Sequence, residues 1–86
     1  MKTKIEIQQE IFALIKKHYK SSECHYVSLT DTMDYAIICD TRLCVRNYPF
    51  IAKRILNNYP QIRVVMFIGG FQDYVYTRNT LKWLAV

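Results

Sequence analysis

The chain has 86 residues, of which 51% are hydrophobic and 14% aromatic, with only two glycines and two prolines. This composition excludes long disorder and collagen-like repeats, and the length predicts a single compact domain over residues 1–86. Twelve Lys and Arg against seven Asp and Glu give a net charge of +5, which favours a polyanionic partner. No apolar run reaches 18 residues, so no membrane partner is predicted, and three scattered cysteines favour a reducing cytoplasm.

The first predicted element is an amphipathic helix beginning after Thr3. Thr3 and Glu6 have the spacing of a capping box, in which a hydroxyl and a carboxylate satisfy the first backbone amides. Apolar residues then recur with helical period from Ile7 to Ile15.

Strand signals follow this helix. His25–Thr30 alternates, and Tyr35–Cys39 is almost wholly apolar, as expected of a central strand. A third strand, Leu43–Arg46, would complete a meander.

A second helix is predicted over Tyr48–Asn58. Pro49 suits its first turn, where a missing N–H costs nothing, and Asn47 is the expected cap. Its apolar face is expected to hold Phe50, Ile51, Ile55 and Leu56. The residues expected to face away are Lys53, Arg54 and Asn57.

Two strand-like runs, Ile62–Ile68 and Phe71–Arg78, are separated only by Gly69 and Gly70, which predicts a hairpin with a two-residue loop. The predicted order is therefore α-β-β-(β)-α-β-β. This order indicates an α+β fold, a two-layer antiparallel sheet of four to five strands with two helices on one face.

A two-residue loop would sort the hairpin side chains onto two faces. The apolar face is expected to pack on the helices; it holds Val64, Met66, Ile68, Phe71, Asp73 and Val75. The other face is expected to form an open platform; its main residues are Arg63, Tyr74, Tyr76 and Arg78. Tyrosine rings stack on unpaired bases and arginines bind phosphates, so this face predicts binding of RNA. A subunit or protein interface and an ordinary surface are the alternatives.

Five further basic residues are predicted phosphate contacts. Lys16, Lys17 and Lys20 lie near the end of the first helix, and Arg42 and Arg46 flank the third predicted strand. The alternative for the lysines is a solvated helix end that suits the helix dipole.

Neither a metal site nor catalysis is predicted, and no cofactor is expected. The side chains that come nearest to a zinc-binding set are Cys24, His25, Cys39 and Cys44. They lack the tight paired spacing of structural zinc sites. Asp34 and Asp40 were considered for a metal-dependent nuclease, but Arg42 stands where lysine is expected and no strand-borne acid lies beside it.

In its overall style the chain resembles small accessory proteins of tailed bacteriophages. The shared features are one short domain rich in Lys, Ile, Asn and Tyr, the helix Thr3–Lys20 and the basic, aromatic hairpin Arg63–Arg78. Such proteins redirect host enzymes or block host defences. The resemblance implies an anti-defence protein of the host cytoplasm, of the type that inhibits a toxin–antitoxin ribonuclease through RNA.

The sequence therefore predicts a non-enzymatic protein that binds RNA or single-stranded nucleic acid, acting as a homodimer. The alternative function is a protein–protein interaction module, an inhibitor or adaptor. Such a module would dock on a target protein through the tyrosine and arginine face or through an exposed edge strand.

Overall fold

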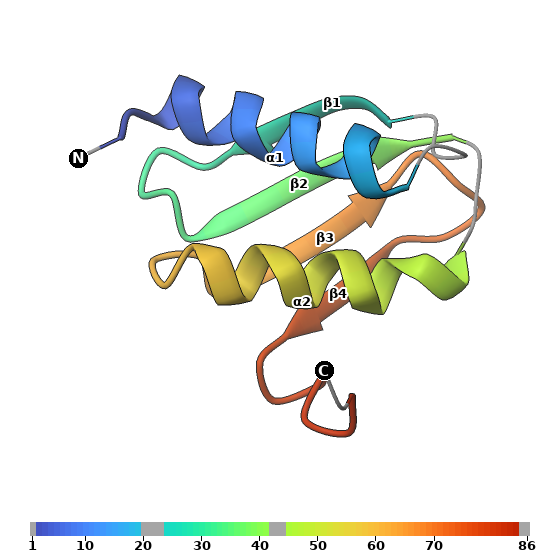
Figure 1. Cartoon of the computed structure of the whole chain (residues 1–86). Coiled ribbons are helices and arrows are strands. Elements are labelled where there is room, and N and C mark those ends of the chain that lie inside the picture. The colour runs from blue at the N-terminus through green and yellow to red at the C-terminus, as the bar shows by residue number, and fades with distance from the viewer. Residues whose placement is uncertain (1, 20–23, 42–44, 85–86) are drawn as a thin grey trace.

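The computed structural model describes residues 2–19, 24–41 and 45–84, which form two α-helices and a four-stranded sheet (Figure 1). The elements in chain order are α1 (Lys4–His18), β1 (Cys24–Leu29), β2 (Tyr35–Asp40), α2 (Tyr48–Asn58), β3 (Val64–Ile68) and β4 (Tyr74–Thr77). The predicted α+β class is confirmed, and so is the order of helices and strands apart from the third predicted strand.

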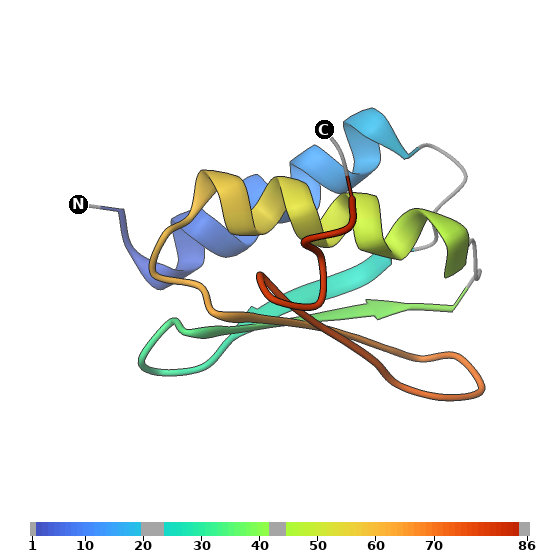
Figure 2. The same cartoon turned by 90° about the horizontal axis from the view of Figure 1, so that it is seen from below.

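Both described helices lie on the same side of the sheet (Figure 2). The strands are ordered β1-β2-β3-β4, with α1 packed on β1 and α2 on β3 and β4. One buried cluster fills the space between the two layers and includes Ile11, Ile38, Ile55 and Phe67. The predicted two-layer arrangement, with the helices on one face, is therefore confirmed.

The sheet is mixed, and the prediction of an all-antiparallel sheet is wrong. β2 and β3 are parallel, whereas β1 pairs with β2 and β3 with β4 in the antiparallel sense. The cause is α2, which carries the chain back to the starting end of β2 before β3 begins. Parallel neighbours need a crossover of this kind, commonly a helix.

The prediction of a third strand over Leu43–Arg46 is also wrong for Val45 and Arg46, the two of its residues that the structure describes. Val45–Asn47 form a short 3-10 helix that leads into α2, and residues 42–44 lie outside the described residues. Both edges of β2 are already occupied, by β1 and β3, so a strand following β2 directly has no free edge of it to join.

Local sequence signals explain where the helices begin. At the start of α1 the Glu6 amide donates to the Thr3 hydroxyl (3.2 Å) and the Thr3 amide donates to the Glu6 carboxylate (3.1 Å). This is the predicted capping box. α2 spans the predicted range with Pro49 in its first turn, but the Asn47 side chain makes no capping hydrogen bond.

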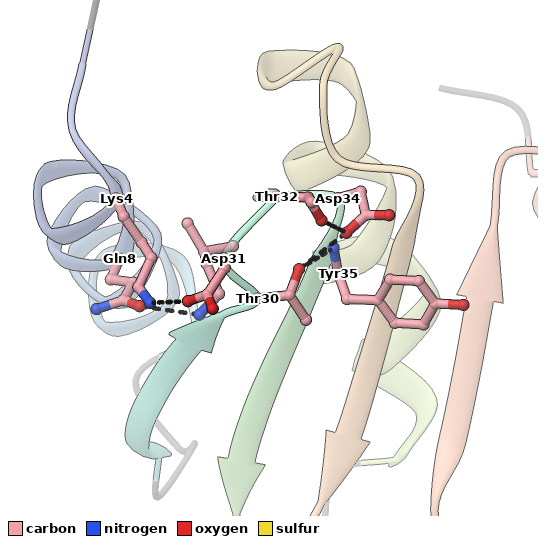
Figure 3. Close-up of polar contacts among 8 residues, drawn as sticks. Lys4, Gln8, Thr30, Asp31, Thr32, Asp34 and Tyr35 are labelled. Atoms are coloured by element: carbon pink, nitrogen blue, oxygen red, sulfur yellow. Dashed lines mark hydrogen bonds and ion pairs between the residues drawn. The ribbon is translucent and has the colours of Figure 1, made fainter.

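The turn between β1 and β2 ties α1 to the sheet (Figure 3). The Leu29 amide donates to the Gln8 side chain (2.9 Å), and Lys4 forms an ion pair with Asp31 (3.3 Å). Gln8 thereby satisfies a backbone amide at the outer edge of β1, which the sheet itself leaves without a partner.

Asp34 organises the same turn (Figure 3). Its carboxylate accepts hydrogen bonds from the hydroxyls of Thr32 and Thr30, and these bonds lower the pKa of Asp34 below its usual 3.8. Its backbone carbonyl accepts from the Arg63 amide (2.7 Å), which joins the turn to the start of β3.

The loop of the second hairpin is longer than two residues. Phe67 pairs with Tyr74 and Val65 with Tyr76, so the loop occupies residues 69–73 and the register is shifted by two from the predicted one. Gly69 has φ of 102°, and a Cβ there would lie 3.0 Å from the Asp40 carbonyl oxygen. A glycine is required because β3 ends against the end of β2.

Candidate nucleic-acid interface

The two tyrosines of the predicted platform lie on the helix side of the sheet, so the predicted assignment of the hairpin faces is wrong. Tyr48 of α2 is stacked on Phe67 of β3, with ring centroids 4.0 Å apart. Tyr74 meets Tyr48 edge-on at 5.6 Å, and Tyr76 meets Phe67 at 5.8 Å. Burial raises the pKa of Tyr76. Both rings are half-buried in this cluster, which leaves them no open sheet on which bases could lie.

Both faces of β3 are apolar, which is why sequence reasoning inverted them. Val65 and Phe67 face the helices, while Val64, Met66 and Ile68 face away. Because polar and apolar residues do not alternate along β3, its sequence does not indicate which face packs against the helices. The contact between Tyr48 and Phe67 decides the orientation, and it exists only after α2 has packed on the sheet.

Arg78 has a structural position. Its guanidinium donates to the carbonyls of Leu56 and Ile62, each at 2.7 Å, and to that of Tyr59 at 3.3 Å. These carbonyls belong to the end of α2 and the segment leading to β3, where a helix leaves its last acceptors unsatisfied. Arg63 is exposed, as Arg78 is, but it forms no ion pair with the other described residues and its guanidinium donates to no backbone carbonyl among them.

Lys16 and Lys17, both predicted near the end of α1, lie on different sides of that helix. Lys16 lies over the Phe12 ring (5.5 Å from its centroid), and Phe12 lines a hollow beside β1. Lys17 is about two turns from Glu10 and therefore on the same side of α1. That side faces α2, because the Glu10 carboxylate accepts from the hydroxyl of Tyr59 (2.6 Å).

The remaining predicted phosphate contacts are distributed as follows. Arg46 is exposed in the 3-10 helix before α2. Lys20 and Arg42 lie outside the described residues. The predicted contacts on the described part of the chain therefore do not form one cluster. Lys17 lies in the last turn of α1, whereas Arg46 lies in the 3-10 helix directly before α2.

A hollow of about 360 Å³ runs along the outer surface of α2. It is lined by Tyr19, Asn47, Phe50, Lys53, Arg54, Asn57 and Asn58. We call these residues the α2 surface. It contains two cations, two aromatic rings and three amides, and no carboxylate. The Lys53 ammonium donates to the Leu84 carbonyl (3.2 Å), which fixes one wall of the hollow.

Sequence reasoning missed the role of Phe50 in this surface. Phe50 was assigned to the buried face of α2, yet it is 46% exposed on the outer side. The signal was available, because a residue two positions from buried Tyr48 and Ala52 is rotated about 200° from each of them. The polar positions Arg54 and Asn57 were correctly expected to point outward.

Charge is segregated along the described part of the molecule. Its two ion pairs, Lys2 with Glu10 (2.7 Å) and Lys4 with Asp31 (3.3 Å), both involve the N-terminal half of α1. The hydrogen bond from Lys2 and then that from Tyr59 lower the pKa of Glu10. Arg54 and Lys17 form no ion pair within the described ranges, so their charge is available to a ligand.

Two chemical alternatives have no support among residues 2–19, 24–41 and 45–84. These residues contain no group of three His, Cys, Asp or Glu that could hold a metal ion. Burial, followed by the charge of Asp40, raises the pKa of Cys24 to about 11, which makes it a poor nucleophile. The same residues include no helix long and apolar enough to span a membrane.

Comparisons with protein-family models, with curated proteins and with solved structures find no match to this chain.

Proposed function

We propose that this protein binds RNA or single-stranded nucleic acid, without catalysis, through the α2 surface. The observation that carries the proposal is the make-up of the hollow along α2. Lys53 and Arg54 lie there beside the exposed ring of Phe50, and none of the described residues that line the hollow carries a carboxylate.

Each kind of side chain on this surface has a role in binding a single strand. Arg54 of the α2 surface would neutralise a phosphate, and so would Lys17, which lies two residues before Tyr19 at the rim of the hollow. Release of the condensed counterions would drive association. Phe50 offers a ring on which an unpaired base can stack, which contributes about 1–3 kcal/mol per base. The amide of Asn57 can donate to and accept from base edges. A duplex keeps its bases stacked inside, so Phe50 favours a single strand or a loop.

This proposal moves the predicted site from the sheet to the helix layer. Arg78 is committed to backbone carbonyls, and Tyr74 and Tyr76 to the aromatic cluster, so these three are left out of the binding surface. The action of the protein as an inhibitor of a host defence ribonuclease stays a prediction of the bacteriophage resemblance.

The test is fluorescence anisotropy of a labelled, mixed-sequence single-stranded RNA titrated with nuclease-treated protein at several salt concentrations. Log K is expected to fall linearly with log salt, by about 0.7 for each phosphate neutralised. The double variant Lys17→Ala/Arg54→Ala should therefore bind more weakly and lower this slope by about 1.4. Phe50→Ala should weaken binding at least about fivefold at every salt concentration, because stacking is not screened.

The matched control is Lys2→Ala/Lys4→Ala, which lowers the net charge by the same two units. Lys4 is 13 residues from Lys17, about 20 Å along α1. This exceeds the Debye length of about 8 Å at physiological salt, so the control should keep the affinity of the wild type. Absence of binding at low salt, or an equal loss in the control variant, would show that the α2 surface is not the site.

A further inference from the structure

The side of the sheet turned away from the helices carries an apolar surface that no described element covers. Figure 2 shows both helices on one side of the sheet, with the other side bare. We call this surface the open face. Its apolar strand residues are Tyr26, Tyr35, Ile37, Cys39, Val64, Met66, Ile68 and Val75, and the uncharged polar residues Ser28 and Thr77 share the face as register partners of Ile37 and Val64.

The centre of the open face is one row of aliphatic side chains crossing three strands. Ile37 of β2 is the register partner of Met66 of β3, and Met66 is the partner of Val75 of β4. Val75 is 51% exposed, Tyr26 is 47% exposed and Tyr35 is 40% exposed, and the other members are half-buried. None of these strand residues is charged, although the chain carries a net charge of +5.

The sequence of the two central strands is that of strands covered on both sides. Tyr35–Asp40 and Val64–Ile68 are near-continuous apolar runs, and they form the parallel pair of the sheet. Parallel strands with such runs are normally packed on both faces, whereas a solvated face alternates with polar residues. The helices of this chain account for the cover on one face only.

The side of the molecule that carries the open face is as large as a stable interface. The molecule measures 32 × 28 × 23 Å and has a surface of 5464 Å². One of six sides of such a block is about a sixth of 5464 Å², or about 900 Å². Specific interfaces bury about 800 Å² per partner, so a partner covering this face would bury enough surface.

We infer that the open face binds the open face of a second copy of this chain, forming a two-fold symmetric dimer. A two-fold interface brings the same patch of both subunits together, so a charged side chain near the axis would meet its own copy and repel it. The open face avoids this repulsion in a chain of net charge +5, because its strand residues are all uncharged. Two such sheets would pack face to face about 10 Å apart, enclosing the row of Ile37, Met66 and Val75 between them.

The α2 surface would point away from this interface on both subunits, because the helices lie on the opposite side of the sheet. The inference is therefore independent of nucleic-acid binding. The dimer could form whether or not the α2 surface binds RNA.

The test is the mass in solution, by analytical ultracentrifugation of nuclease-treated protein from about 1 to 100 µM. The wild type is expected at about twice 10.3 kDa at high concentration. Met66→Lys and Val75→Lys, which place a charge in the open face, should each sediment as monomers of about 10.3 kDa. Far-UV circular dichroism establishes that each variant is folded. Val75 is the safer of the two positions, because half of it is already exposed.

The matched control is Gln61→Lys, which adds the same charge at an exposed position in the segment between α2 and β3. It should remain dimeric. A wild type that is monomeric at 100 µM would overturn the inference and leave the open face to another protein. Dimers of Val75→Lys and Met66→Lys as stable as the wild-type dimer would overturn it as well, since the interface would then lie elsewhere.

Discussion

Replacement of Arg78 distinguishes a structural role from a role in ligand binding. The sequence placed Arg78 among the nucleic-acid contacts, whereas the structure shows its guanidinium donating to the carbonyls of Leu56 and Ile62, each at 2.7 Å. In Arg78→Ala these carbonyls lose a charged donor at the end of α2. The protein is therefore expected to lose stability.

The magnitude follows from the two short hydrogen bonds. A hydrogen bond to a charged group contributes about 1.5–3 kcal/mol. Arg78 is an exposed residue, so water replaces part of each bond in the variant, and we expect a total loss of about 2–3 kcal/mol. For a domain of this size each kcal/mol corresponds to about 4–8 °C, which places the fall in Tm at roughly 8–24 °C. Arg78→Lys should fall between, since one ammonium cannot reproduce the two-pronged guanidinium.

The assay is thermal and urea unfolding followed by circular dichroism, with RNA affinity measured on the same samples below Tm. Arg63→Ala is the control, because Arg63 is exposed and forms no ion pair with other described residues. It should change the free energy of unfolding by less than about 0.5 kcal/mol. If Arg78→Ala is as stable as Arg63→Ala but has lost RNA affinity, the structural role is refuted and Arg78 is a ligand contact.

Three further predictions concern the hairpin and the turn at Asp34. Phe67→Ala should cost about 3–5 kcal/mol in unfolding experiments on dilute protein, because Phe67 is buried against Tyr48; the fully exposed Phe71 should tolerate alanine within about 0.5 kcal/mol, and equal effects would contradict the burial assignment. Gly69→Ala should destabilise by about 1–3 kcal/mol because φ at Gly69 is positive, whereas Gly70→Ala should have little effect; the comparison is urea unfolding, and a neutral Gly69→Ala would refute the strained turn. The pKa of Asp34 is lowered by the hydroxyl bonds in the folded state, so its stabilising contribution is present above the usual value of 3.8 and is lost as the pH falls through the lowered pKa. Wild type should thus lose more stability than Asp34→Asn on acidification below about pH 4; an unchanged pH profile in Asp34→Asn, followed by circular dichroism, would remove this role.

The sequence by itself determined the local elements of this protein. The hydroxyl of Thr3 and the carboxylate of Glu6 cap the start of α1. Pro49 lies in the first turn of α2, and that helix spans the range that the sequence predicts. These signals act between residues a few positions apart, so they can be recognised without the fold. The spacing of apolar residues along each helix and strand is equally local, and the order of these elements predicts the α+β class.

Only the tertiary structure decided which side of each element is covered. β3 is apolar on both faces, so its inner face is chosen when Phe67 stacks on Tyr48 of another element. The role of Arg78 was hidden for the same reason, since its acceptor in α2, Leu56, lies 22 residues away in the sequence. The residues of the α2 surface likewise come together only when the end of α1 meets α2. Periodicity shows how side chains alternate along one element. Which of its faces is buried, and which groups it bonds to, depends on contacts between elements that are distant in the chain.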